Sequence, residues 1–174
     1  MATEAKQAVL SVLKKALSIE QAGHKFYVQG AAKMKDENAR RALLGLAQDE
    51  LSHIERIRGI HSALAAGETV PMIQPGDITR AEDVFESFRK KLPRQKATPG
   101  ALKILELAME AERRSYHFYK KGEDSTKDPQ LKEFYKRLAG EENEHYEILQ
   151  NTQFYLKDPE MWYAREERHM ADGG

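Results

Sequence analysis

Two short segments of the chain place a histidine three residues after a glutamate, a pattern that suits metal binding. The segments are DELSH, with Glu50 and His53, and EENEH, with Glu142 and His145. Residues three apart on a helix lie on the same face, so one residue of the pair can bridge two metal ions while its neighbour binds one of them. The pattern therefore predicts helical metal-binding segments.

The two segments belong to an internal duplication. A shift of 92 positions places the first half of the chain on the second, and each Glu-x-x-His pair then follows a single glutamate by thirty residues. The same shift matches Phe26 and Tyr27 with Phe118 and Tyr119. Six potential ligands are thus expected at one level of a helical core: Glu20, Glu50, His53, Glu112, Glu142 and His145.

Four carboxylates in one apolar layer need compensation, because an ionised group removed from water without partners is costly. Two divalent cations would balance the four negative charges, while neutral imidazoles add ligands without charge. Iron is the expected metal, with manganese or zinc as alternatives, since affinity alone does not select among them. The competing interpretation is a bundle whose polar layer is satisfied by internal hydrogen bonds or water.

Apolar residues recur at helical spacing in the segments that must position these side chains. The spacing predicts helices over 4–33 and 37–66, then over 99–122 and 129–157. Asp36, Thr98 and Asp128 are expected N-caps, while Gly67 and Gly122 are expected near helix ends. On the second and fourth helices, the Glu-x-x-His pairs interrupt an inward apolar seam at the same level.

The two helix pairs, 4–66 and 99–157, are joined by a long crossover over 67–98 that is rich in proline and glycine. Within it, TRAE at 79–82 predicts a capping box and a short helix. Asp158 and Pro159 predict a last short helix in the segment 158–174, with Trp162 packed on the end of the bundle. We therefore expect one all-α domain over 1–174.

Composition excludes several classes of function. Lys plus Arg and Asp plus Glu are both 28, so no basic excess favours nucleic acid or anionic lipid. The chain has no cysteine, which excludes disulfides, thiolate zinc sites and cysteine-bound iron centres within it. Without a signal-peptide pattern or a long apolar run, a soluble cytoplasmic protein with no membrane partner is expected.

The combination of Glu20, DELSH, the crossover, Glu112 and EENEH resembles the rubrerythrin-like branch of the ferritin-like diiron carboxylate proteins. The resemblance covers nearly the whole chain and implies a ferritin-like four-helix bundle with two irons. It implies Glu50 and Glu142 as bridging ligands. It also implies that Glu20 and Glu112 bind one iron each, alongside His53 and His145.

The sequence departs from that family in two ways. Rubrerythrins carry a cysteine-rich rubredoxin domain, which this chain lacks, and an additional carboxylate one helical turn after the glutamate of the third helix, where Ser115 stands. The counterpart of Ser115 in the first half is Gly23. We therefore expect two nearly equivalent metal surroundings and a weaker preference for peroxide than a seven-ligand relative would have.

Four side chains near the expected ligands are candidates for hydrogen bonds to them: His24, Tyr27, Tyr116 and Tyr119. Packing in the core is the alternative for all four, and it is the preferred interpretation of the tyrosines that follow a phenylalanine. Asp49 and Glu141 precede the expected bridging glutamates and could orient a histidine. Because a neighbour in sequence points well round the helix, solvated charges are the preferred interpretation of both.

The leading functional prediction is an oxidoreductase that reduces hydrogen peroxide or dioxygen with electrons from an external donor, a chemistry of defence against oxidative stress. Access to the centre is expected to be small, suiting these oxidants better than an organic molecule. The alternatives are a ferroxidase or iron-storage protein and a purely structural bundle. We also expect a homodimer, and the long crossover permits helix pairs to be exchanged between chains.

Overall fold

The computed structural model describes the backbone of residues 2–69 and 98–172 and the side chains of 6–69 and 98–165. The regular structure in these ranges is entirely helical. The capping box at 79–82 and the short helix expected after it lie outside the described residues. The described helices are α1 (Ala2–Ala31), α2 (Glu37–Ala66), α4 (Pro99–Ser125), α5 (Pro129–Lys157) and α6 (Pro159–Asp172).

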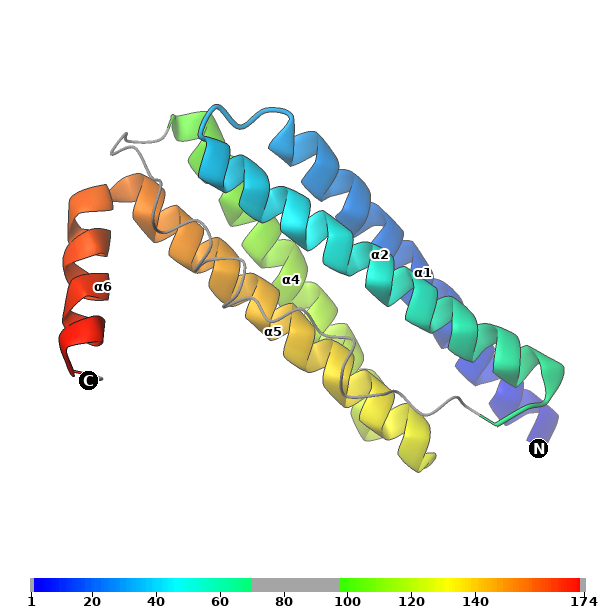
Figure 1. Ribbon diagram of the computed structural model, residues 1–174. Helices are drawn as coiled ribbons and strands as arrows, with labels where there is room; N and C mark the ends of the chain where they lie inside the picture. Colours follow the sequence, from blue (N-terminus) through cyan, green and yellow to red (C-terminus); the bar gives the residue numbers. More distant parts are fainter. Residues whose placement is uncertain (1, 70–97, 173–174) are drawn as a thin grey trace.

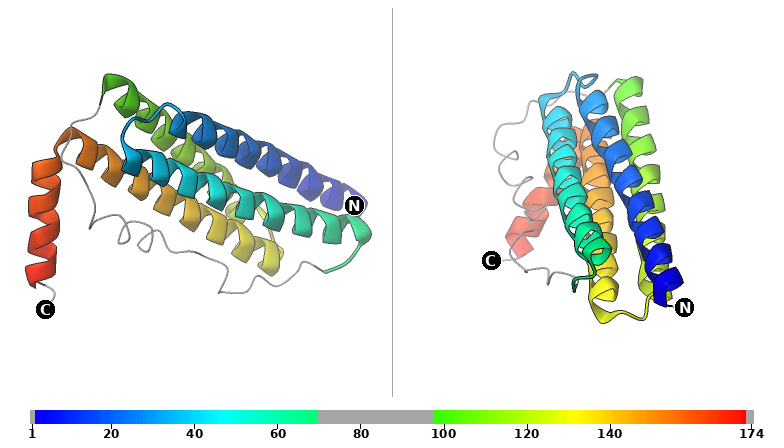
Figure 2. Two further views of the ribbon diagram at one scale, coloured as in Figure 1. Left: turned by 45° about the horizontal axis from the view of Figure 1, so that its top comes forward. Right: turned by 90° about the vertical axis from the view of Figure 1, so that its right-hand side faces the viewer.

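Four long helices lie side by side as a bundle, and α6 turns away at one end (Figure 1). Helix α1 packs along α2 and α4 packs along α5, while the two pairs meet through α1 with α4 and α2 with α5 (Figure 2). The predicted all-α four-helix bundle is thus confirmed. No helix in the described ranges is both long and apolar enough to cross a membrane.

Local capping chemistry sets most of the helix boundaries. The Asp36 carboxylate accepts hydrogen bonds from the backbone N–H groups of Asn38 and Ala39, and Asp128 and Thr98 act in the same way at α5 and α4. Gly67 ends α2 with a φ of 82°, a left-handed conformation that favours glycine. These four predicted boundaries are confirmed.

The predicted end of the third helix near Gly122 is wrong, because α4 continues to Ser125. Gly122 remains helical, and a Cβ atom placed on it would lie 3.0 Å from the ring of Tyr135 on α5. Here the missing side chain allows two helices to approach closely. The glycine therefore serves packing rather than helix termination.

The apolar core consists of two clusters with the polar level between them. One cluster includes Leu43, Leu105 and Leu149, and the other includes Leu13, Ile57 and Phe134, all fully buried. Trp162 closes the first cluster with its ring edge against Tyr155, and its indole N–H donates to Asn151 at 2.9 Å. The prediction that Trp162 packs on the bundle is confirmed.

Candidate metal centre

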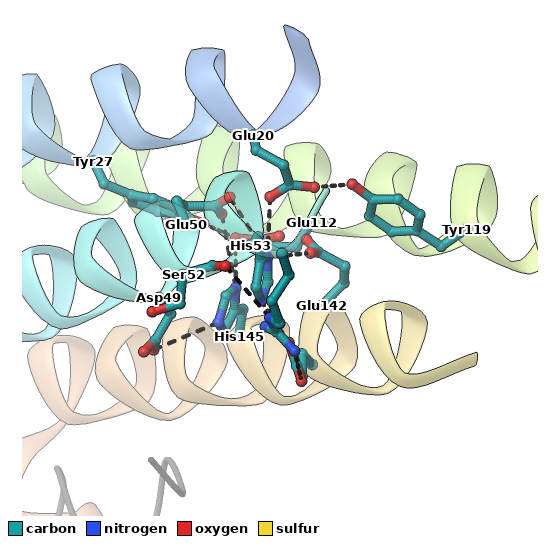
Figure 3. A network of polar contacts seen from close by, with 12 residues as sticks. Glu20, Tyr27, Asp49, Glu50, Ser52, His53, Glu112, Tyr119, Glu142 and His145 are labelled. Atoms are coloured by element: carbon teal, nitrogen blue, oxygen red, sulfur yellow. Dashed lines mark hydrogen bonds and ion pairs between the residues drawn. The ribbon is translucent and has the colours of Figure 1, made fainter. Parts of the chain in front are cut away.

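All four long helices contribute to one buried polar level between the two apolar clusters (Figure 3). Each of its six residues is at most 4% exposed. They are Glu20 from α1, Glu50 and His53 from α2, Glu112 from α4, and Glu142 and His145 from α5. The structure thus brings together every residue predicted as a metal ligand.

The six residues form two overlapping groups that could each hold a metal ion. Glu50, Glu112, Glu142 and His145 make up one group, and Glu20, Glu50 and His53 make up the other. Within each group, one potential ligand atom per residue lies within 4.8 Å of the others. Because Glu50 is common to both, the two positions are neighbours.

Both imidazole rings turn their Nδ1 atoms toward the carboxylates. His53 Nδ1 lies 3.0 Å from Glu20 and 3.2 Å from Glu142, while His145 Nδ1 lies 3.6 Å from Glu112 and 3.8 Å from Glu50. The two rings stack with centroids 5.4 Å apart and planes 10° apart. Their Nε2 atoms therefore face the other way, toward the outside of the cluster.

Glu141 and Arg56 form a largely buried ion pair on the Nε2 side of the His53 ring. The Nε2 atom of His53 is 2.6 Å from the Glu141 carboxylate, which also accepts a hydrogen bond of 2.8 Å from Arg56 Nη1. The prediction of a solvated charge at Glu141 is wrong, since this residue is only 7% exposed. Because α5 packs along α2, the position before Glu142 faces α2 instead of water.

The corresponding contact behind His145 is looser. Asp49 lies 3.6 Å from His145 Nε2, and its side chain is 31% exposed, so it remains partly solvated. The ligand sets of the two halves match, whereas the outer contacts of the two histidines do not. A signal was present in the sequence, since Asp49 and Glu141 are acidic residues at matching positions of the duplication.

Two buried tyrosines bind the carboxylates across the bundle. The Tyr27 hydroxyl on α1 donates to Glu112 on α4, and the Tyr119 hydroxyl on α4 donates to Glu20 on α1. Both rings are buried in the core, which was the interpretation preferred from the sequence. Both hydroxyls also donate hydrogen bonds to expected metal ligands, which was the other interpretation. Among the described contacts of His24 and Tyr116 there is none to the cluster, and Tyr116 packs its ring against His117.

Burial and mutual repulsion shift the ionisation of the carboxylates. Burial raises the pKa of Glu112 to about 7. Burial together with the neighbouring carboxylates raises the pKa values of Glu50 and Glu142 well above the usual range. Burial also acts on Glu20, but hydrogen bonds with Glu50 and His53 outweigh it and lower its pKa to about 2. The group therefore holds protons at neutral pH unless cations replace them.

The donor set fits divalent metal ions. Glu142 Oε1 and His145 Nδ1 are buried without a hydrogen-bond partner among the described residues, although each points at other members of the cluster. Carboxylate oxygens with two imidazole nitrogens suit iron, manganese and zinc. Cations at this level would bind the two orphaned atoms and balance the buried charge, so the residues fit a metal site.

A cavity of about 440 Å³ adjoins the cluster between α1 and α4. Buried Glu50 and Glu112 lie at its inner end, beside Gly23 and Ser115. A Cβ atom on Gly23 would lie 3.1 Å from the Glu50 carboxyl group, so glycine keeps this end open. The opening is larger than the small access expected from the sequence.

Comparison with known proteins agrees with the geometry. The family model described as rubrerythrin matches residues 11–153, which include both Glu-x-x-His pairs. A solved structure, the hypothetical protein Pfu-1136390-001 from Pyrococcus furiosus, is 24% identical, with a TM-score of 0.62 over 84% of this chain and 89% of that chain. That likeness shows a shared fold. No curated protein matches the sequence significantly.

Proposed function

The chain belongs to the rubrerythrin family, and on this premise we propose that it is a diiron oxidoreductase that reduces hydrogen peroxide or dioxygen with electrons from an external donor. The observation that carries this proposal is the buried level of four glutamates and two histidines with an open cavity beside it. A purely structural bundle would gain nothing from so costly a layer, because burying unpaired carboxylates is unfavourable.

The proposed ligand arrangement follows the two overlapping groups. Glu20, Glu50 and His53 would hold one iron, and Glu50, Glu112, Glu142 and His145 would hold the other. The family resemblance implies Glu142 as a second bridging ligand beside Glu50. Glu50 already belongs to both groups. Four carboxylates balance two iron(II) ions, so the filled centre would be neutral in an apolar surrounding.

Two bound iron(II) ions would supply the two electrons that, with two protons, convert one hydrogen peroxide molecule into two water molecules. The surrounding residues keep the ligands in place for this. Tyr27 and Tyr119 each occupy one oxygen of a terminal glutamate, and Glu141 holds the ring of His53 with its Nδ1 toward the centre. The apolar clusters cover the level on both sides along the bundle axis, and the cavity between α1 and α4 is left as an open side.

Metal analysis with rapid mixing tests the proposal. The protein is loaded with iron(II) without oxygen, assayed for iron, and mixed with peroxide or dioxygen in the presence of excess chemical reductant. We expect about two irons per chain, repeated turnover, and loss of metal in Glu50→Ala and Glu142→Ala. Unchanged metal content in both variants would reject the bridging assignment, and uptake of many irons per chain would instead support iron storage.

A further inference from the structure

The cavity between α1 and α4 is larger than the proposed oxidants require. Its volume of about 440 Å³ is roughly fifteen times the share of one water molecule in the liquid. A molecule of peroxide or dioxygen occupies about one or two times the volume of a water molecule. The volume falls instead within the range of sites that bind small organic molecules.

The walls of the cavity are apolar. Ile19, Ala22 and Phe26 line it from α1, while Leu107 and Ala111 line it from α4. Leu107 is 49% exposed, so water now covers apolar surface that an organic molecule could cover instead. The walls therefore favour a ligand that is mostly apolar.

Polar groups are confined to the two ends of the cavity. The inner end carries the Ser115 hydroxyl beside the carboxylates of Glu50 and Glu112. At the outer rim, Glu110 and Arg114 are paired with each other at 2.9 Å. Because the rim charges neutralise one another, the cavity suits an uncharged ligand with a polar group at one end.

Small residues line the inner end of the cavity. Gly23 and Ser115 occupy matching positions of the two halves and leave the inner end free. On the side where α2 meets α5, the ion pair of Arg56 and Glu141 occupies the corresponding region next to the cluster. The cavity therefore gives the centre a face for ligands between α1 and α4.

We propose that the cavity binds an uncharged organic molecule with an apolar body and one polar end, held directly beside the metal ligands. This binding rests on the cavity alone and not on the proposed oxidoreductase function. The charged rim disfavours a second copy of the chain as the occupant, since the cores of protein interfaces are depleted of charge.

The test is a fluorescence titration of metal-free and iron-loaded protein with 1-aminoanthracene, an uncharged aromatic amine. We expect saturable binding of one probe per chain. Ala22→Phe and Ala111→Phe, which fill the cavity, should weaken binding at least tenfold. Ala8→Phe, the same change at an exposed position of α1 outside the cavity, should leave binding unchanged. Helicity and iron content confirm that each variant is intact.

The outcomes separate this inference from the proposed function. Equal probe binding in the wild type and both cavity variants, or none in the wild type, would overturn the inference even if oxidation by peroxide proceeds. Probe binding that is sensitive to both variants, in a protein that shows no turnover, would support the cavity and reject the oxidoreductase. A dimer by light scattering that dissociates in the two cavity variants would show that a second chain covers this face, which overturns the inference.

Discussion

His53 and Glu141 are joined across the bundle, with the histidine Nε2 atom on α2 lying 2.6 Å from the glutamate carboxylate on α5. Arg56 donates a hydrogen bond to the same carboxylate and so holds it in position. The contact fixes which nitrogen of His53 faces the centre. Partners of this kind orient a ligand and increase its basicity, and their loss typically costs 10-fold to 100-fold in metal affinity.

We expect Glu141→Gln to weaken metal binding about 10-fold or more, because the substitution removes the charge that holds both His53 and Arg56. Asp49→Asn is the matched variant on the other side and should have a smaller effect, since Asp49 is 3.6 Å from His145 and partly exposed. Anaerobic titration with cobalt(II), followed by absorbance, measures both. Equal losses of metal affinity in the two variants would contradict the prediction that Glu141 supports His53 more strongly than Asp49 supports His145.

The two tyrosine hydroxyls should stabilise the metal-free fold. Tyr27→Phe and Tyr119→Phe each leave a buried carboxylate oxygen without its donor, which costs about 1–3 kcal/mol. Urea unfolding of the chelated protein gives the value. Tyr135→Phe, a buried ring in the neighbouring apolar cluster, is the control and should cost less. A larger loss for Tyr135→Phe would argue against the carboxylate contacts.

Stability of the metal-free protein should fall as pH rises from about 5 to 8. Burial raises the pKa of Glu112 from 4.5 to about 7, so in this window the folded state keeps a proton that the unfolded chain has released. The free energy of unfolding then decreases with pH, and Glu112 alone contributes on the order of 3 kcal/mol to the decrease. The raised pKa values of Glu50 and Glu142 act in the same direction. The lowered pKa values of Glu20 and Glu141 act below this window.

Urea unfolding of chelated protein at several pH values tests this dependence. Glu112→Gln should make the curve less steep, because the amide does not titrate while Glu50 and Glu142 still do. Metal-loaded protein should also show a flatter curve, since cations replace the protons. A free energy of unfolding that rises steadily from pH 5 to 8 in the wild type would refute the assignment.

Gly23→Ala should disturb the metal centre without unfolding the helix. The added Cβ atom would lie 3.1 Å from the Glu50 carboxyl group, which must shift to accommodate it. We expect lower metal affinity in the same cobalt titration. Gly59→Ala is the control, because nothing lies within 4 Å of a Cβ atom there, and alanine should stabilise that helix by about 0.5–1 kcal/mol. Full metal affinity in Gly23→Ala would show that the close approach is unimportant.

The residue at position 115 should influence the choice of oxidant. Ser115 lines the cavity next to Glu112 and is too short and uncharged to act as a further carboxylate ligand. We expect the diferrous wild type to be oxidised by both peroxide and dioxygen, and Ser115→Glu to shift the preference toward peroxide. Stopped-flow oxidation by each oxidant measures the ratio of rates. A strong wild-type preference for peroxide that Ser115→Glu leaves unchanged would exclude this role.

The features predicted correctly from sequence are those that depend on local chemistry or on periodicity. The cap at Asp36 and the seam containing Glu50 and His53 follow from short spacings. The contact between Glu141 and His53 was missed because it depends on how α5 is rotated against α2, which no single helix pattern specifies. Gly122 was misinterpreted for the same reason, since its neighbour Tyr135 belongs to another helix.

The supporting contacts of the centre all cross between the two halves of the chain. Tyr27 reaches Glu112, Tyr119 reaches Glu20, and each histidine meets an acidic residue of the opposite pair. Neither helical hairpin could therefore assemble such a site alone. Two copies of one hairpin, related by a twofold axis, could form equivalent contacts, so a chain of half this length could bind metal as a pair.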